Sequence, residues 1–242
     1  AGQAALCVTC HNSRVEKPEE YAKQSVSGPH FGPQAEVFAG IGAILPAGEK
    51  LDTSTHASDM FSLRNFTGDD KDPEANNLCV TCHMSPKEPE GMAGRDEVGT
   101  HSYAMRSGAK QNLAVCNKCH AQLGAELPTL NVEASGDYDG DGKTEGVQDE
   151  VKGLLDIIGN LLPPKGSPEV KLPEDLTQTS EKEKQAAYNY FLVKRDGSYG
   201  IHNTAYSVGV LQKTYKILTG KSFKEAFPKA AGRMVAPEIA LL

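Results

Sequence analysis

The sequence predicts a mostly irregular, loop-rich chain with α-helices, in which a small helical region forms the C-terminal part. Composition is the first reason: Leu, Ile, Val and Phe supply only 49 of the 242 residues, Trp is absent, and there are 24 Gly and 14 Pro. A chain so poor in large apolar side chains has little material for an ordinary core. Periodicity is the second reason, because apolar residues recur at helical spacing only after residue 146. Some other apolar body must therefore supply the core of the first half.

The pattern C-x-x-C-H occurs three times and uses every cysteine of the chain. In c-type haem attachment, two thiolates bond to the porphyrin and the following histidine binds the iron. The attachment residues would be Cys7, Cys10 and His11, then Cys79, Cys82 and His83, and finally Cys116, Cys119 and His120. We therefore expect a multihaem cytochrome c, wrapped around three covalent haems whose apolar faces replace a side-chain core.

Two other uses of the cysteines compete with haem. Zinc knuckles are also built from C-x-x-C pairs, but tetrahedral zinc needs an even number of pairs and does not require a histidine after each second cysteine. A disulfide framework has no reason to repeat this one spacing three times in a chain of 242 residues. Haem attachment explains both the spacing and the histidine.

The chain divides into three regions along its length. Residues 1–130 hold the three motifs, separated by loops rich in Gly and Pro such as 28–33 and 86–97. Residues 131–165 combine an acidic loop with a helix, and residues 166–242 form a helical C-terminal region that supplies a distal haem ligand. Glycine lets the backbone approach a flat ring closely, and proline fixes the direction of approach, so loops of this composition suit haem packing.

Three segments carry helix signals. The apolar residues of the first segment recur at intervals of three and four and end before the proline pair 163–164. They are Val147, Val151, Leu154, Leu155, Ile158 and Leu162. The other two segments are residues 181–194, which open after Ser180, and residues 204–218, which close at Gly220.

Each haem iron also needs a second axial ligand, which is usually histidine or methionine in electron carriers. Four histidines remain once the motif histidines are assigned, namely His30, His56, His101 and His202. We predict all four as distal ligands, because three open iron sites lie within one chain that offers few other strong ligands. The weaker competitors are Met60, Met84, Met92, Met105 and Met234.

Four local patterns resemble the multihaem c-type cytochromes of metal-reducing bacteria, a group that includes outer-surface cytochromes that polymerise into conducting filaments. The patterns are H-F-G-P-Q from His30, C-V-T-C-H-M from Cys79, H-S-Y-x-M-R from His101 and G-I-H-N-x-x-Y from Gly200. In that group the corresponding histidines are distal haem ligands, which implies this role for His30, His101 and His202. The chain departs from the group in number, because filament subunits of this kind usually carry four or more haems.

Residues 137–145 match the first part of an EF-hand calcium loop. Oxygen-bearing side chains occupy loop positions 1, 3, 5 and 9, glycine occupies position 6, and a helix follows directly. The predicted ligands are Asp137, Asp139, Asp141, the carbonyl of Lys143, Glu145 and Gln148. Gln148 stands at position 12, where a bidentate Glu is usual, so Asp149 or Glu150 would have to compensate. A solvated acidic turn is the alternative, although similar loops followed by G-V-Q-D-E-V in the cytochrome group favour Ca²⁺.

The formal net charge of −7 and the lack of a Lys/Arg cluster argue against a nucleic-acid partner. The longest uncharged apolar run, residues 37–48, is too short and too rich in glycine to span a bilayer. Thioether attachment of haem is a chemistry of exported proteins, so we expect a periplasmic or extracellular chain whose signal peptide has been removed.

We expect electron transfer through a chain of bis-histidine haems, without enzymatic activity, to other redox proteins or to extracellular acceptors. An alternative is a small multihaem oxidoreductase with one open iron, which would reduce a nitrogen or sulfur oxyanion. Four distal candidates for three irons leave one histidine over, and the apolar end 239–242 also needs a partner. These features predict head-to-tail self-association into a filament, with a monomeric periplasmic electron shuttle as the competing state.

Overall fold

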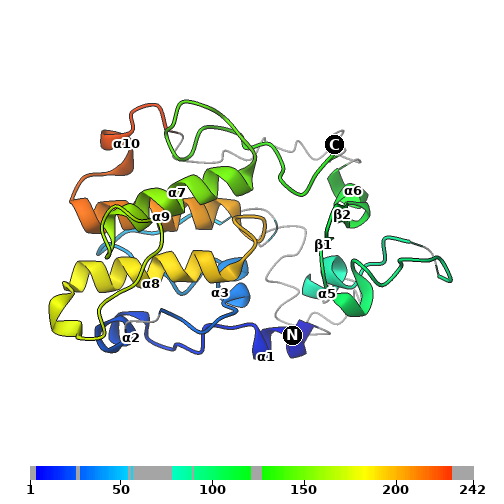
Figure 1. The fold of residues 1–242 in the computed structure, drawn as a ribbon, viewed down its shortest axis with the longest axis horizontal. Helices are drawn as coiled ribbons and strands as arrows, with labels where there is room; N and C mark the ends of the chain where they lie inside the picture. The colour runs from blue at the N-terminus through cyan, green and yellow to red at the C-terminus, as the bar shows by residue number, and fades with distance from the viewer. Residues whose placement is uncertain are drawn as a thin grey trace. The chain divides into compact units, whose positions relative to one another are not determined.

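The chain folds into two compact units. The computed structural model describes residues 4–25, 28–53, 56, 78–88, 90–120 and 127–230. One unit, which we call the motif unit, comprises residues 1–9 and 61–132, and the other, the helical unit, comprises residues 10–60 and 133–242. Helices and loops make up nearly all of the described residues (Figure 1).

Three long helices build the helical unit, namely α7 (Val147–Leu161), α8 (Glu181–Asp196) and α9 (Thr204–Thr219). Helix α9 packs against both α7 and α8, as Figure 1 shows. The periodicity prediction for α7 is confirmed, because its six predicted apolar residues are all buried. Leu192 and Val193 of α8 and Val210 and Leu211 of α9 complete the same core.

Local sequence fixes where these helices begin and end. Ser180 accepts a hydrogen bond from the backbone of Glu183, and the Glu183 carboxylate accepts one from the backbone of Ser180, which forms a capping box at the start of α8. Asn203 caps α9 by accepting from the backbone of Tyr206, and Gly220 ends α9 in the left-handed conformation. The bounds predicted from the sequence for α8 and α9 are confirmed to within two residues.

Residues 10–60 belong to the helical unit. Helices α2 (Pro18–Gln24) and α3 (Gln34–Ala39) pack against α8. The side chain of Asn189 on α8 is fully buried and bonds to both the N–H and the carbonyl of Ile44. Sequence periodicity does not reveal such a contact, because a single buried amide carries it.

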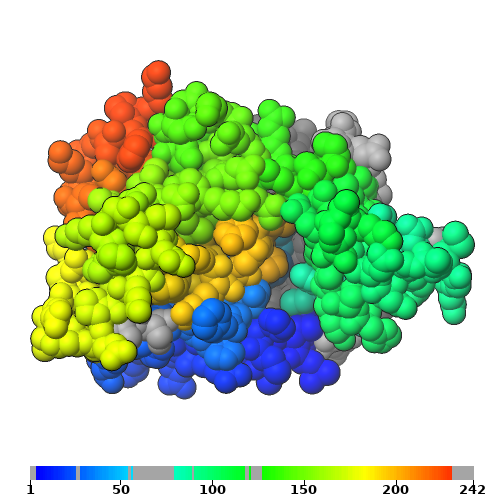
Figure 2. Space-filling model, in the orientation of Figure 1, coloured from blue at the N-terminus to red at the C-terminus, as the bar shows by residue number. Residues whose placement is uncertain are grey.

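The connection between α7 and α8 lies on these two helices and contains the short 3-10 helix η4 (Leu176–Gln178). The Tyr190 hydroxyl donates to the carbonyl of Pro168. A Cβ added to Gly159 would lie 2.9 Å from that same carbonyl oxygen, so the chain can approach α7 closely only over glycine. In Figure 2 this connection, drawn in yellow-green, covers part of the surface of the helical unit.

A cluster of aromatic rings closes the far end of α9. Phe223, on the short helix α10 (Phe223–Ala226), stacks on Phe227 with a centroid separation of 4.4 Å. Tyr215 of α9 packs edge-on against both rings. The cluster extends the side-chain core to the end of the described chain.

The motif unit is built differently. Its helices α1 (Ala5–Cys10), α5 (Leu78–His83) and α6 (Ala114–His120) are one or two turns long, and α1 runs on into the first residue of the helical unit. The 3-10 helix η2 (Thr100–Ser102) and the antiparallel strand pair β1 (Arg106–Ser107) and β2 (Lys110–Gln111) lie between α5 and α6 in the sequence. The buried apolar residues described in this unit are Ala4, Val98, Val115 and Leu130.

None of the helices that the structure describes combines the length and the apolar composition of a bilayer span.

Candidate functional site

The two cysteines of each C-x-x-C-H motif lie on a short helix, α1, α5 or α6; His83 and His120 end α5 and α6, whereas His11 follows the last residue of α1. Residues three apart on a helix share a face, so the two cysteines of a motif can present their sulfurs on the same side. Cys7, Cys10, Cys79, Cys82 and Cys116 form no disulfide, and the side chain of Cys119 lies outside the described residues. The helical setting therefore suits attachment of one porphyrin edge by two sulfurs.

The first and second motifs meet at their leading cysteines within the motif unit. Burial raises the pKa of the Cys79 thiol, and the neighbouring Cys7 thiol raises it further by its charge and by a hydrogen bond. Helices α5 and α6, which carry the second and third motifs, also pack against each other. The three motifs thus form a continuous series.

Two candidate ligand histidines have their Nδ1 atom hydrogen-bonded to a backbone carbonyl. His83 Nδ1 lies 2.8 Å from the carbonyl oxygen of Tyr103, and His56 Nδ1 lies 3.0 Å from that of Ile201. Because a carbonyl oxygen can only accept, Nδ1 must carry the proton, and Nε2 of the neutral ring keeps its lone pair. In both residues Nε2 is therefore the ring nitrogen whose lone pair could bind a metal.

His11 follows the same rule through Gln34. The Gln34 amide donates from Nε2 to the carbonyl of Asp196 at 2.9 Å, which fixes the orientation of the amide. Its Oε1 atom then faces His11 Nδ1 at 3.0 Å and must be the acceptor. Nε2 of His11 is again the nitrogen with the free lone pair.

His202 is the fourth histidine with a hydrogen-bonded Nδ1 atom, and its acceptor is a carboxylate. Its Nδ1 lies 2.6 Å from Oδ1 of Asp196, whose side chain is fully buried, while the His202 side chain is 22% exposed. Burial by itself lowers the pKa of His202, but the charge of Asp196 and its hydrogen bond raise the pKa more, so that it stands above its usual value. The carboxylate orients the ring and directs Nε2 away from Asp196.

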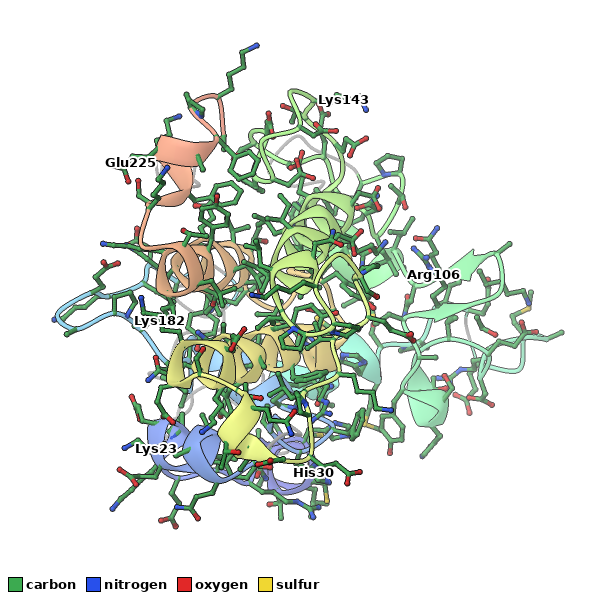
Figure 3. The ribbon with its side chains drawn as sticks, turned by 60° about the vertical axis from the view of Figure 1, so that its left-hand side comes forward. Lys23, His30, Arg106, Lys143, Lys182 and Glu225 are labelled. Carbon is green, nitrogen blue, oxygen red and sulfur yellow. The ribbon has the colours of Figure 1, made fainter. Side chains whose placement is uncertain are left out.

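The other predicted distal ligands, His30 and His101, are exposed. Within the described part of the chain, neither ring takes part in a hydrogen bond that would fix its tautomer. His30 lies at the edge of the helical unit, on the side where Figure 3 labels Lys23 of α2. His120 is half-buried at the end of α6. Of the competing methionines, Met60 and Met234 lie outside the described residues.

Large apolar side chains beside the candidate haem residues are exposed to solvent. Leu6, next to Cys7, is 82% exposed, and Phe31, next to His30, is 75% exposed. Tyr103, whose carbonyl orients His83, is 53% exposed. An apolar macrocycle on these side chains would remove their surface from water. Cysteine pairs without disulfides, fixed ring tautomers and exposed apolar side chains are together the features that a covalent haem requires, so the residues fit this cofactor.

The acidic loop brings three carboxylates together. Oxygen atoms of Asp137, Asp139 and Glu150 all lie within 4.8 Å of one another. Glu150, on the first turn of α7, is 1% exposed and accepts hydrogen bonds from the backbones of Tyr138, Asp139 and Glu145. It therefore fastens both ends of the loop to the helix.

The other predicted calcium ligands are not part of this group. Gln148 directs its amide to the carbonyl of Ser198 at 3.0 Å, and Glu150, two residues further along α7, is the helix side chain grouped with Asp137 and Asp139. Asp141 and Glu145 are exposed, and Asp141 accepts from both the backbone and the ammonium group of Lys143. Figure 3 shows Lys143 at the outer end of the loop.

Burial raises the pKa of Asp139 to about 6, against a hydrogen bond from the Asp141 backbone that lowers it, and the charges of Glu150, Asp141 and Asp137 raise it further. The Asp139 carboxylate lies against the backbone of α7 at Gly153, where an added Cβ would come 1.8 Å from Oδ2. A cation would relieve the repulsion among these groups, and hard oxygen donors are the ligands that Ca²⁺ prefers. The donor set therefore fits calcium.

Sequence reasoning missed the residues that hold the histidines. Gln34 was noted only as part of the pattern that follows His30, and Asp196 carried no signal six residues before His202. His56 also has a less distinctive sequence setting than the other distal candidates, yet its ring is held as firmly as that of His83. Only the fold brings these acceptors to the rings.

No protein-family model, no curated protein sequence and no solved structure matches the chain.

Proposed function

We propose that the protein transfers electrons through three covalently bound c-type haems and catalyses no substrate reaction of its own. The observation that carries the proposal is the shared state of His11, His56, His83 and His202, whose Nδ1 atoms all face an oxygen acceptor. Two of these histidines follow C-x-x-C pairs, and two are distal candidates. Histidines that ligate a metal through Nε2 are held in this way.

The chain's own residues would have two tasks in this function. Cysteines of the three motifs would hold the haems by thioether bonds, and histidine Nε2 atoms would fill both axial positions, which leaves no iron open to a substrate. The proximity of Cys7 to Cys79, and of α5 to α6, would keep successive haems near each other. When bound, the haem iron supplies the one-electron chemistry.

Peptide mass spectrometry of the purified holoprotein tests the attachment. We expect a haem on each of the three motif peptides, at Cys7 and Cys10, at Cys79 and Cys82, and in the peptide of the third motif. Free thiols, or a disulfide such as one between Cys7 and Cys79, would contradict the proposal at that motif.

Binding of carbon monoxide to the dithionite-reduced protein tests whether an iron is open. We expect no rapid binding to the wild type. The variants His30→Ala, His56→Ala, His101→Ala and His202→Ala should each open one iron to carbon monoxide if the replaced residue is a ligand. Rapid stoichiometric binding to one haem of the wild type would instead favour a multihaem oxidoreductase.

We also propose that Asp137, Asp139 and Glu150 hold a Ca²⁺ ion, which would stabilise the helical unit and would not act in electron transfer. Support comes from three converging carboxylates, two of which are buried. A calorimetric titration should detect calcium binding to the wild type and to Gln148→Ala, since the Gln148 side chain faces Ser198. Glu150→Gln should abolish the signal, and equal binding by all three proteins would refute the site.

The surplus histidine supports a further part of the proposal, in which one histidine ligates a haem of a neighbouring chain and subunits join head to tail. The partners would be copies of this chain and, at the ends, other redox proteins or extracellular acceptors. The apolar tail 239–242, which contributed to this prediction, lies outside the described residues. Sedimentation of the four alanine variants provides the test: one of them should remain folded yet fail to assemble, and a wild type that is monomeric at high concentration excludes assembly.

A further inference from the structure

We infer that Asp196 is a positioning residue that gives the haem ligated by His202 the lowest reduction potential of the three. The inference rests on the proposed function, because it concerns a ligand of a haem. It assigns a role to a residue outside every motif of the sequence. The juxtaposition that carries it is a fully buried carboxylate 2.6 Å from Nδ1 of the ligand candidate.

Asp196 ends helix α8 and is followed by Gly197, which turns the chain in the left-handed conformation. Its Oδ2 atom accepts from the backbone and the hydroxyl of Ser198, and its Oδ1 atom accepts from His202. The Ser198 hydroxyl in turn accepts from the backbone of His202. Carboxylate, serine and histidine therefore form one closed network that holds the ring rigidly.

No cation is seen to neutralise this carboxylate within the described part of the chain. The adjacent Arg195 directs its guanidinium to the carbonyl of Pro29 and lies over the rings of Phe31 and Phe191. The hydrogen-bond partners of the Asp196 carboxylate are Ser198 and His202. The full negative charge thus acts on His202.

The other three fixed histidines differ in the charge of their acceptor. His56 and His83 donate to backbone carbonyls, and His11 donates to the neutral amide of Gln34. A carboxylate draws the Nδ1 proton more strongly than a neutral oxygen, which makes Nε2 a stronger donor to iron. Ferric iron carries one more positive charge than ferrous iron and gains more from such a ligand, so the potential falls.

A spectroelectrochemical titration of the full-length holoprotein tests the inference. The step measured is the one-electron reduction of ferric to ferrous iron, with dithionite as the electron source. We expect three potentials in the wild type. His202→Met should replace the lowest of them, whereas His56→Met should replace a higher one.

Asp196→Asn keeps the shape of the side chain and removes its charge. It should raise only the lowest potential, by the equivalent of about a tenfold or larger change in the ferric-to-ferrous ratio. Ser198→Ala is the matched control, because it removes a hydrogen bond from the same carboxylate and keeps the charge, and it should leave all three potentials in place.

The possible failures are distinguishable. A wild type without covalent haem, or with an iron open to carbon monoxide, refutes the proposed function. If three six-coordinate haems are present and Asp196→Asn leaves their potentials unchanged, or shifts all three equally, only the role of Asp196 is refuted. If Asp196→Asn does not fold, the comparison of His202→Met with His56→Met decides, and survival of the lowest potential in His202→Met overturns the inference.

Discussion

The two units of the protein differ in what fills their interior. The helical unit has a continuous cluster of buried apolar side chains that joins α7, α8, α9 and α10. In the motif unit, the described residues include only four buried apolar side chains. The large apolar side chains of Leu6 and Tyr103 are exposed there. One unit has a side-chain core of its own, whereas the described residues of the other leave large apolar side chains exposed.

This difference explains why a chain with so few large apolar residues can fold. Burial of apolar surface is the main favourable term in folding, and the helical unit concentrates that surface in long amphipathic helices. The motif unit has short helices, which are marginal by themselves in water. We therefore expect covalent haem to serve as core in the motif unit and to matter less for the helical unit.

The largest expected effect separates the units by removing one haem. Cys79→Ala with Cys82→Ala deletes the second proposed attachment point and should expose the backbone of residues 78–120 to hydrogen exchange as in an unfolded segment, because under the proposed function the haem would supply the core there. Residues 147–219 should keep their protection. Exchange read by mass spectrometry, with the wild type as control, measures both, and full protection of 78–120 in the variant would mean that side chains suffice as its core.

A second change acts on the opposite unit. Leu154 of α7 is fully buried, and Leu154→Ala should lower the free energy of unfolding by about 2–5 kcal/mol through lost burial and the cavity left behind. Asp156→Ala, on the exposed face of the same helix, should stay within about 0.5 kcal/mol of the wild type. Urea unfolding followed by far-ultraviolet circular dichroism gives these values, and haem content should remain three per chain.

The sequence predicted local features of both units, but it did not predict contacts between distant segments. In the helical unit, periodicity and capping residues located α7, α8 and α9, because each signal is local and repeats along one element. The attachment motifs are local too, and the two cysteines of each lie on a short helix. The acceptors of the candidate ligand histidines are not local: Gln34 lies 23 residues from His11 in the first motif, and Ile201 lies 145 residues from the distal candidate His56. Such pairs depend on how segments pack, which no spacing encodes.

The sequence predicted the acidic loop and left open whether Asp149 or Glu150 compensates for Gln148. Counting from Asp137 placed Gln148 at the final position of an EF-hand loop, but the register of α7 brings Glu150 to the carboxylates. A carboxylate at the first turn of the helix can reach three backbone N–H groups of the loop, which explains its burial without a neighbouring lysine. The chemistry could be read from the sequence, whereas the helix register could not.

The pH dependence of the calcium-free protein tests the electrostatics of this loop. The pKa of Asp139 is raised to about 6 in the folded state, whereas an unfolded Asp titrates near 4. The folded state therefore holds a proton that the unfolded state loses, so the stability from Asp139 is complete below about pH 4 and is lost as pH rises through about 6. The loss amounts to about 3 kcal/mol at most.

Calcium should reverse this loss, since it binds the ionised carboxylates. With chelator present, the melting temperature should fall between about pH 4 and pH 7, and added Ca²⁺ should restore it at pH 7 but not at pH 4. Asp139→Asn is the control and should flatten the dependence on both pH and calcium. A chelated wild type with no decline in this range would show that Asp139 titrates normally.

The smallest expected effect concerns a single cap in the helical unit. Ser180→Ala removes the capping box of α8 and should cost about 1 kcal/mol, because α8 carries buried residues of the core and an unsatisfied N–H weakens the whole helix. Ser222→Ala removes the same kind of box from α10, which has only four residues, and should cost less.

The stability that the capping box of α8 contributes should also depend on pH. The hydrogen bond from Ser180 holds the pKa of Glu183 below its usual value, so the stability from this contact is present above the unfolded pKa and is lost as pH falls through the folded one. The difference in stability between wild type and Ser180→Ala should therefore shrink below about pH 4.

Urea unfolding monitored by circular dichroism reports mainly on the long helices, and the haem Soret band reports on the haem sites. If the units have independent cores, Ser180→Ala should shift the first transition more than the second. Equal shifts of both signals would show that the two units unfold as one, and the contrast between them would then hold for packing but not for stability.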